Sequence, residues 1–367
     1  MRISFFGSSL VSAYWNGAAT YYRGILRALA ERGHEITFYE PDAYGRQEHR
    51  DIEDPPWATV VVYDPAEDAV MDALDEARHD DLIVKASGVG VFDELLEAVI
   101  VDLKTCSNIV AFWDVDAPAT LDRVHGNPGD PFASLISRYD VVFTYGGGNP
   151  VVSAYEKLGA RQCVPIYNGL DTRTHHPVPP DPAFDAALGF LGNRLPDREA
   201  RVEEFFFRPA AQLPRHRFLL GGAGWGDRVN GRADSANVAW LDHVYTRDHN
   251  AFNCTPLAVL NVSRESMARY GFSPATRVFE AAGAAACLIT DRWEGIDQFF
   301  EPGKEILVAD DGSAVVSHLL ELSPERAREI GDAAFRRAIA EHTYAHRGET
   351  VEAVLEGRAV AYGVAAI

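Results

Sequence analysis

The residues from Ser273 to Glu280 have the types and spacing of a helix start that binds anions. Because serine is a preferred N-cap and proline a preferred first helical residue, we predict a helix that begins at Pro274. The free backbone N–H groups of such a start attract phosphate. Arg277 and Glu280 are three residues apart, so a guanidinium would lie beside the phosphate and a carboxylate near ribose hydroxyls. The alternative is a capped helix with an internal ion pair.

A glycine turn follows the apolar run Leu188–Leu191, which reads as a strand. Gly192 and Asn193 permit close approach of the backbone to a ligand at the carboxyl edge of a sheet. Arg194 and Arg198 follow at the point where a phosphate would lie. A solvated arginine pair is the alternative for these two residues.

A second turn, Gly221–Gly224, follows the next expected strand. Gly222 is one of the residues expected to need a positive φ there. Trp225 comes directly after the turn and either stacks on a bound base or closes the core. In the first half of the chain, the loop Gly7–Gly17 offers glycines, Gly17 among them, whose neighbouring amides can face a phosphate. This loop lacks the Gly-x-Gly-x-x-Gly fingerprint of dinucleotide sites.

The elements that must position these residues alternate along the chain as strand and helix. An amphipathic helix is predicted from Ala18 to Arg32, and short apolar runs separated by helical patterns predict parallel strands joined by crossover helices. The fold class is therefore α/β, with two Rossmann-like, doubly wound domains facing each other across a cleft. The predicted strands are Ile3–Phe6, Thr37–Tyr39, Ala58–Tyr63, Leu82–Lys85, Asn108–Phe112, Val141–Thr144, Leu188–Leu191, Arg217–Leu220, Ala258–Val262, Cys287–Thr290 and Ile306–Val308.

A proline-dense stretch at 172–182 divides the chain, because it cannot continue a helix or a central strand. We place the linker there. The expected domains are residues 1–175, joined by a C-terminal helix at 347–367, and residues 176–346.

Composition excludes several classes of protein. The 367 residues are 47% hydrophobic and 24% charged, which suits full-sized cores, and the net charge of −20 opposes binding to nucleic acid or an anionic membrane. No stretch has the length and apolarity of a membrane span. The cysteines are isolated and no histidine pair has ligand spacing, so we expect a cytoplasmic protein without a metal site. The four cysteines are Cys106, Cys163, Cys254 and Cys287.

A series of short motifs runs in order through the region from about Phe143 to Arg347, and this region resembles the CgeB-like bacterial glycosyltransferases, relatives of the two-domain GT-B enzymes. The motifs are Tyr145–Gly148, Leu158–Ala160, Asn168–Asp171, Leu191–Arg194 with Arg198, Gly221–Trp225, Leu260–Arg264, Ser273–Glu280, Gly303–Glu305 and Glu341–Tyr344.

The resemblance implies a nucleoside-diphosphate sugar, with UDP-glucose as the expected donor, bound mainly by the second domain without a metal. Glu280 would bind the donor ribose and Arg277 the diphosphate. Many retaining relatives carry a second glutamate eight positions earlier, and this chain has Phe272 there. Retention is still the expected outcome. The end of one predicted strand would line the sugar or phosphate with Asn261, Ser263 and Arg264.

Two carboxylates in the first domain are candidates for work on the acceptor, a small molecule or glycan. Asp114 and Asp116 follow a predicted strand, and either one could serve as the general base for an acceptor hydroxyl or orient the sugar. Capping of the next helix is the alternative. An Asp-x-Asp pair also occurs in single-domain, metal-dependent transferases, but two complete α/β halves argue against that fold.

Two other functions fit the same sequence. One is a non-catalytic protein that binds a sugar nucleotide or belongs to the spore surface, and the absence of the first glutamate favours it. The other is an epimerase of nucleotide sugars built on the same plan. The chain is expected to be a monomer or a homodimer.

Overall fold

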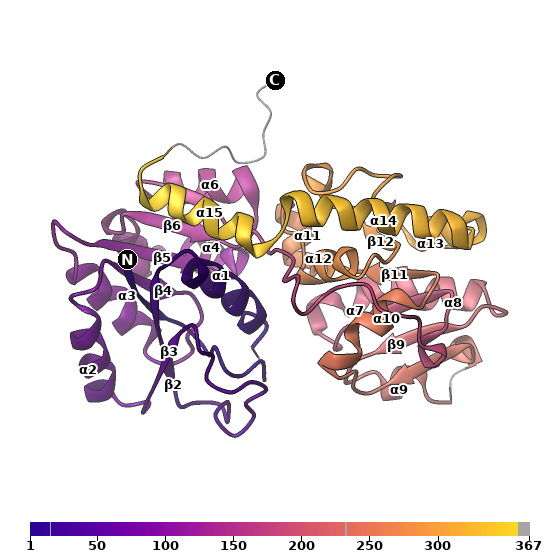
Figure 1. Cartoon of the computed structure of the whole chain (residues 1–367), viewed down its shortest axis with the longest axis horizontal. Coiled ribbons are helices and arrows are strands. Elements are labelled where there is room, and N and C mark those ends of the chain that lie inside the picture. Colours follow the sequence, from indigo (N-terminus) through magenta and orange to yellow (C-terminus); the bar gives the residue numbers. More distant parts are fainter. Residues whose placement is uncertain (15, 232, 359–367) are drawn as a thin grey trace. The chain divides into compact units, whose positions relative to one another are not determined.

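The computed structural model describes residues 1–14, 16–231 and 233–358 (Figure 1). The chain divides into two compact units. Unit 1 comprises Met1–Asn168 and the chain from Tyr344 onward, and unit 2 comprises Gly169–Thr343. The proline-dense stretch 172–182 thus lies inside unit 2. Of the terminal helix expected at 347–367, residues 359–367 lie outside the described residues.

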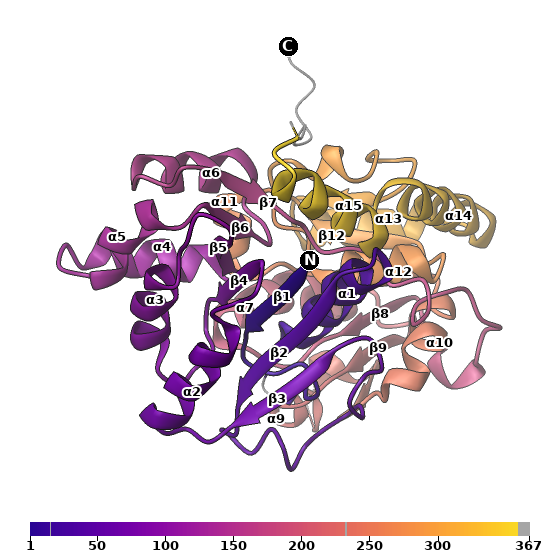
Figure 2. The same cartoon turned by 60° about the vertical axis from the view of Figure 1, so that its left-hand side comes forward.

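Unit 1 contains a parallel, seven-stranded sheet with the order β3-β2-β1-β4-β5-β6-β7 (Figure 2). The order reverses direction between β1 and β4, which makes this pair of strands the topological switch point. Phe5 of β1 lies opposite Phe38 of β2 and Val84 of β4. The strands are β1 (Arg2–Phe6), β2 (Glu35–Pro41), β3 (Thr59–Tyr63), β4 (Leu82–Ala86), β5 (Ile109–Asp114), β6 (Val141–Thr144) and β7 (Cys163–Pro165).

The helices of unit 1 follow from amphipathic segments between these strands. On α1 the side chains of Tyr22, Ile25, Leu26 and Leu29 are buried, as the apolar stripe in the sequence predicts. Helix α15 packs along α1 (Figure 1), and the ring of Tyr344 lies where a side chain at Gly24 would be. The helices are α1 (Ala19–Glu31), α2 (Glu67–Ala77), α3 (Asp93–Asp102), α4 (Ala117–Gly126), α5 (Pro131–Leu135), the 3₁₀ helix η1 (Ile136–Arg138), α6 (Gly148–Lys157) and α15 (Tyr344–Leu355).

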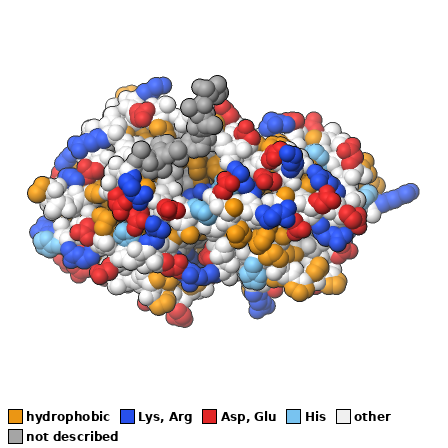
Figure 3. Space-filling view, turned by 45° about the horizontal axis from the view of Figure 1, so that its top comes forward, with side chains coloured by type: hydrophobic (Ala, Val, Ile, Leu, Met, Phe, Trp, Pro, Cys, Tyr) orange, Lys and Arg blue, Asp and Glu red, His pale blue; other side chains and the backbone are white. Residues whose placement is uncertain are grey.

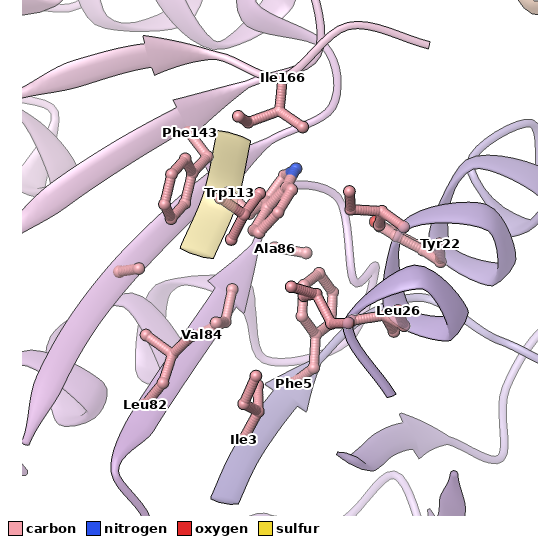
Figure 4. Close-up of a cluster of buried hydrophobic side chains, with 14 of the residues drawn as sticks. Ile3, Phe5, Tyr22, Leu26, Leu82, Val84, Ala86, Trp113, Phe143 and Ile166 are labelled. Carbon is pink, nitrogen blue, oxygen red and sulfur yellow. The ribbon is translucent and has the colours of Figure 1, made fainter. Parts of the chain in front are cut away.

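The core of unit 1 is built from the strands and α1 (Figure 4). The ring of Trp113 lies 4.6 Å from that of Phe143 and 5.6 Å from that of Phe5, measured between centroids. The indole N–H of Trp113 donates to the hydroxyl of Tyr21, so the buried polar atom is satisfied. A core of this kind fixes the strand ends, where ligands bind in α/β folds.

Unit 2 contains a parallel, six-stranded sheet with the order β10-β9-β8-β11-β12-β13. Its switch point lies between β8 and β11. The strands are β8 (Leu188–Leu191), β9 (Phe218–Gly221), β10 (Val238–Leu241), β11 (Ala258–Asn261), β12 (Leu288–Asp291) and β13 (Leu307–Ala309). The expectation of an α/β fold with two doubly wound, parallel sheets is confirmed.

The helices of unit 2 cover this sheet, and a second core of buried aliphatic and aromatic side chains lies beneath them. The α-helices are α7 (Pro196–Val202), α8 (Arg208–Gln212), α9 (Gly226–Val229), α10 (His249–Cys254), α11 (Glu265–Tyr270), α12 (Thr276–Gly283), α13 (Gly312–Glu321) and α14 (Pro324–Glu341). Shorter turns are η2 (Pro182–Phe184), the π-helical η3 (Glu203–Phe207), η4 (Ala233–Ser235), η5 (Thr246–Asp248) and η6 (Ile296–Gln298).

Acidic and basic side chains are interspersed over the face drawn in Figure 3. Such mixing, together with the net charge of −20, gives that face no single-sign basic field for a phosphate backbone. No helix among the described residues is long and apolar enough to cross a membrane.

Candidate functional site

The carboxyl ends of β8 and β11 bring the candidate residues of unit 2 together. Arg198 lies in the first turn of α7, the helix that follows β8, and Arg264 lies in the loop after β11. Helix α12 follows and carries Arg277 and Glu280. Because these strands flank the switch point of the sheet, the cluster lies where doubly wound folds bind their ligands.

Arg277 and Glu280 face each other on α12, as their spacing predicts. Arg277 Nη1 lies 2.8 Å from Glu280 Oε2, and the two side chains are 19% and 12% exposed. Nevertheless, Nε and Nη1 of Arg277 are buried and make no hydrogen bond to any described residue. The ion pair therefore leaves buried donors of Arg277 unsatisfied, and buried donors of this kind require an acceptor.

Two histidines that no motif in the sequence singles out also lie near Glu280. His175 Nε2 lies 3.8 Å from Glu280 Oε1, and the rings of His175 and His249 are 6.4 Å apart between centroids. Burial lowers the pKa of both histidines, that of His249 to about 4, so both are neutral at pH 7. Burial alone would raise the pKa of Glu280, but Arg277 and the two histidines hold it below its ordinary value.

The start of α12 differs from the prediction. The helix begins at Thr276 rather than at Pro274, and the N-cap is Ala275, without a side-chain cap. The hydroxyl of Ser273 donates to the carbonyl of Gly271, 2.8 Å away, and Ser273 is buried. The expected cap was wrong because Gly271 and Phe272 both have positive φ values, which form a turn that carries Ser273 away from the helix end.

Arg198 is the second arginine of the cluster. Its Nη2 donates to the carbonyl of Asn193 at 2.6 Å, and its buried Nε has no hydrogen-bond partner among the described residues. Burial lowers the pKa of Arg198; Asp197 opposes this effect, and the positive charges of Arg277 and Arg264 add to it. The positive charges of Arg277 and Arg264 therefore both act on Arg198 at this strand edge.

Arg194, by contrast, lies in a surface ion-pair network. Its Nη2 is 2.5 Å from Glu199 Oε1 and its Nη1 is 2.7 Å from Asp227 Oδ1. Both ends of the guanidinium are occupied, which corrects the expectation that Arg194 receives a phosphate. Arg264 likewise bonds Asp197, at 2.5 Å, but it stays next to Arg198.

The two glycine turns lie against each other. Gly222 has φ +129°, and a Cβ there would lie 2.4 Å from the carbonyl oxygen of Gly192, so only glycine fits. Asn193 Oδ1 accepts the N–H of Ala223 at 3.0 Å. Gly192, Asn193 and Gly222 therefore hold the loops after β8 and β9 in place, which is a positioning role beneath Arg198.

Three predicted ligand contacts are instead parts of the protein interior. Trp225 is 1% exposed and donates its indole N–H to the carbonyl of Gly192 at 2.9 Å, so it closes the core and cannot stack on a base. Asn261 is buried and donates to Thr290 Oγ1. Ser263 is buried and bonds Asp291 through both its N–H and its hydroxyl. All three side chains are buried and hydrogen-bonded within the protein. This corrects the expectation that they contact the donor.

In unit 1, Asp114 is also a structural residue. It is fully buried and accepts hydrogen bonds from Ser87 Oγ at 2.8 Å, Thr120 Oγ1 at 3.0 Å and the Tyr155 hydroxyl. Burial raises its pKa despite these donors. An acceptor molecule cannot touch this carboxylate, so Asp114 is not a general base. Asp116, at the N-cap of α4, is partly exposed and makes no side-chain cap, and it remains a candidate.

The loop after β1 is held in place by hydrogen bonds to Glu40 of β2 and within the loop. Ser9 Oγ and Leu10 N both donate to Glu40, at 2.9 and 2.5 Å, and the amide of Asn16 donates to the carbonyl of Ser9. The side chain of Ser9 is thus committed to the protein. Gly17 at the end of the loop is exposed, and a Cβ there would meet nothing within 4 Å, so the structure shows no close approach that requires this glycine.

A hollow of about 480 Å³ opens in unit 2 at the loop after β12. Its lining includes Trp293, Glu294 and Asp297. Phe272 is adjacent, because its N–H donates to the carbonyl of Glu294 at 2.6 Å. Among the described residues no group of three or more His, Cys, Asp or Glu side chains is placed to hold a metal ion.

Residues 198–353, which include most of unit 2, match a glycosyltransferase family domain that is described as "Glycosyl transferase-like". None of the curated proteins compared with the chain matches it.

Solved structures similar to the whole chain share its fold at low identity. Sucrose-phosphate synthase from Thermosynechococcus elongatus is 13% identical with a TM-score of 0.68, over 97% of this chain and 98% of that one. HepE from Anabaena in complex with UDP-glucose is 14% identical with a TM-score of 0.66, over 97% and 100%. T4 phage BGT in complex with its UDP-glucose substrate is 12% identical with a TM-score of 0.60, over 98% and 100%. The chain therefore has the GT-B fold.

Proposed function

We propose that this protein transfers a sugar from a UDP-sugar to the hydroxyl of a small or medium-sized acceptor. The observation that carries the proposal is the set of buried, unsatisfied guanidinium donors of Arg277 and Arg198 at the switch point of unit 2. A diphosphate supplies both the acceptors and the negative charge that these donors need. The glycosyltransferase family domain spans the same residues, and two of the similar structures hold UDP-glucose.

The geometry supports the following roles, which are part of the proposal. Arg277 and Arg198 bind the diphosphate, and Glu280, held ionised by its neighbours, accepts hydrogen bonds from the ribose. Asn193 and the two glycines keep the loop beneath the phosphates in place. The hollow beside Phe272 takes the sugar, where Glu294 and Asp297 can accept hydrogen bonds from its hydroxyls.

The reaction breaks the bond between the anomeric carbon and the diphosphate oxygen and forms one to the acceptor oxygen. Negative charge develops on the leaving diphosphate, and preorganised guanidiniums stabilise that charge. The arginines supply the positive charge that a divalent cation would otherwise supply, so we propose a metal-independent reaction. The proton of the acceptor hydroxyl goes to a base, for which Asp116 is the candidate in unit 1.

The finer assignments rest on the resemblance in the sequence. Membership in the CgeB-like group, and retention of the anomeric configuration, are proposed on that basis. The four cysteines are free, which fits the reducing cytoplasm that we propose as its compartment.

Calorimetry with UDP, GDP, ADP and dTDP tests the donor site. We expect UDP to bind more tightly than the other diphosphates, with the same affinity in the presence of EDTA. Release of UDP from UDP-glucose in the presence of an acceptor would establish transfer. A protein that binds none of the four diphosphates is not a nucleotide-sugar transferase, and one that isomerises UDP-glucose without an acceptor is an epimerase.

A further inference from the structure

A second hollow, of about 470 Å³, lies in unit 1 and is lined by Tyr14, Tyr44, Arg46 and Gly90. Tyr14 follows β1, Tyr44 and Arg46 follow β2, and Gly90 follows β4. All three loops leave the carboxyl ends of their strands, and β1 and β4 form the switch point of this sheet. The hollow therefore occupies the position at which doubly wound sheets bind small molecules.

Tyr44 presents a fixed aromatic ring to this hollow. Its φ of 58° is in the left-handed region, which is rare for an aromatic residue. Its hydroxyl donates to the carbonyl of Gly90 at 2.6 Å, and a Cβ at Gly90 would lie 2.9 Å from the ring. The side chain is nevertheless 59% exposed. An immobilised and accessible ring is a stacking surface for another ring.

Tyr14 adds a second aromatic surface. It is 41% exposed, and its ring stacks on that of His49 with centroids 4.0 Å apart and planes 9° apart. The two tyrosines come from different loops, one after β1 and one after β2, so two neighbouring loops each contribute an aromatic ring to the hollow.

Arg46 supplies a buried positive charge next to the rings. It is 7% exposed, and its guanidinium carbon lies 5.0 Å from the centroid of the Tyr44 ring. Its Nη1 donates to the carbonyls of Ser8 and Val89, at 3.0 and 3.5 Å. Its Nε has no hydrogen-bond partner among the described residues.

No carboxylate in the described part of the chain forms an ion pair with Arg46. Glu40 is near enough to affect it but already accepts hydrogen bonds from Ser9, Leu10 and Gln47. Burial lowers the pKa of Arg46, although Tyr44, Glu40 and Tyr22 oppose that effect. A buried cation with carbonyl partners alone is stabilised by an anion that enters the site.

We propose that this hollow binds the acceptor, and that the acceptor is a ring compound with a carboxylate or phosphate group. The ring stacks on Tyr44 and the anionic group pairs with Arg46. The identification of this ligand as the acceptor rests on the proposed sugar transfer, but the binding of an anionic ring does not.

Binding measured by ligand-observed NMR tests this inference with defined probes. Glucuronate and 4-hydroxybenzoate carry a carboxylate, glucose 6-phosphate carries a phosphate, and methyl glucoside and phenol are the neutral counterparts. We expect at least one anionic probe to bind about tenfold more tightly than its neutral counterpart, the factor for one charge-assisted hydrogen bond. Whether a carboxylate or the phosphate binds identifies the anionic group.

Three variants assign the binding to the hollow. Tyr44→Asn removes the ring while asparagine tolerates the left-handed backbone, and Arg46→Gln removes the charge. Tyr44→Asn should weaken the bound probe about tenfold, and Arg46→Gln should abolish the preference for the anion, whereas Arg46→Lys should retain part of it. If Arg46→Gln fails to fold, the affinity of Tyr44→Asn for the probe decides whether the probe binds in this hollow.

The affinity for UDP separates this inference from the proposed function. UDP binding should be the same in all three variants, because their residues lie in unit 1. Normal UDP binding with no preference for any anionic probe would overturn the inference alone. Binding of an anionic ring by a protein that binds no UDP would overturn the transfer reaction and leave the hollow as a site for anionic rings.

Discussion

His175 Nε2 lies 3.8 Å from Glu280 Oε1, so a residue of the proline-dense stretch reaches the carboxylate proposed to bind the ribose. The side chain of Asn250, on α10, holds this stretch on unit 2, because it donates to the carbonyl of Thr174 and accepts the N–H of His176. Glu280 thus has Arg277 and two histidines beside it, and the positive charge of Arg277 is the largest effect that lowers its pKa and keeps it an acceptor of hydrogen bonds.

Replacing Glu280 by glutamine should weaken UDP binding by about 1.5–3 kcal/mol, because the ribose would lose hydrogen bonds to a charged acceptor. Calorimetric titration with UDP measures this loss. Glu329→Gln, at an exposed position of α14, is the matched control and should bind UDP normally. Equal affinities in the two variants would show that Glu280 does not bind the nucleotide.

Arg198→Gln and Arg194→Gln form a second matched pair, because the two arginines are four residues apart in very different surroundings. Arg198 has a buried, unsatisfied donor, and Arg194 is paired with two carboxylates. We expect Arg198→Gln to weaken UDP binding about tenfold and Arg194→Gln to leave it unchanged. The assignment is reversed if Arg194→Gln has the larger effect in the same titration.

The stability of the protein should fall on acidification because His249 is buried and uncharged. Its pKa is about 4 in the folded protein and about 6.5 in the unfolded chain, so the unfolded chain takes up the proton first. Stability contributed by the neutral residue is present above pH 6.5 and is lost as the pH falls from about 6.5 to about 4.

Denaturant unfolding at pH 7 and pH 5 measures this loss, for which each unit of pKa difference corresponds to about 1.4 kcal/mol. His249→Gln should lose less stability between the two pH values than the native chain. His79→Asn, at an exposed position, is the control and should behave like the native chain. If His249→Gln loses as much stability between pH 7 and pH 5 as the native chain does, another group causes the loss of stability at low pH.

The strand pattern of both units could be predicted from the sequence because buried parallel strands are continuous apolar runs. Val141–Thr144 and Leu188–Leu191 have the predicted bounds. Two of the four edge strands, β7 and β10, are not predicted by the sequence. Cys163–Pro165 is only three residues long, and in Val238–Leu241 three of the four residues are only partly buried, so neither has the signal of a central strand.

The candidate site was less predictable, since burial decides whether a polar residue is available. Arg277 and Glu280 could be paired from their spacing alone. Tryptophan and asparagine often contact ligands, so the sequence favours that role for Trp225 and Asn261. Only the three-dimensional structure shows that both are buried. The approach of His175 to Glu280 joins residues more than a hundred positions apart, and no local pattern contains it.

Asp114→Asn should reduce the stability of unit 1 rather than the chemical step. The carboxylate accepts hydrogen bonds from Ser87, Thr120, Tyr155 and the N–H of Asp116, and an amide would turn one acceptor into a donor that faces other donors. We expect a loss of about 1–3 kcal/mol, the cost of a buried unsatisfied group. Chemical denaturation gives this value, and the UDP affinity should be unchanged. Asp116→Asn is the comparison: a fall in turnover with normal stability would assign the base to Asp116, whereas full stability and impaired turnover in Asp114→Asn would restore Asp114 as a catalytic candidate.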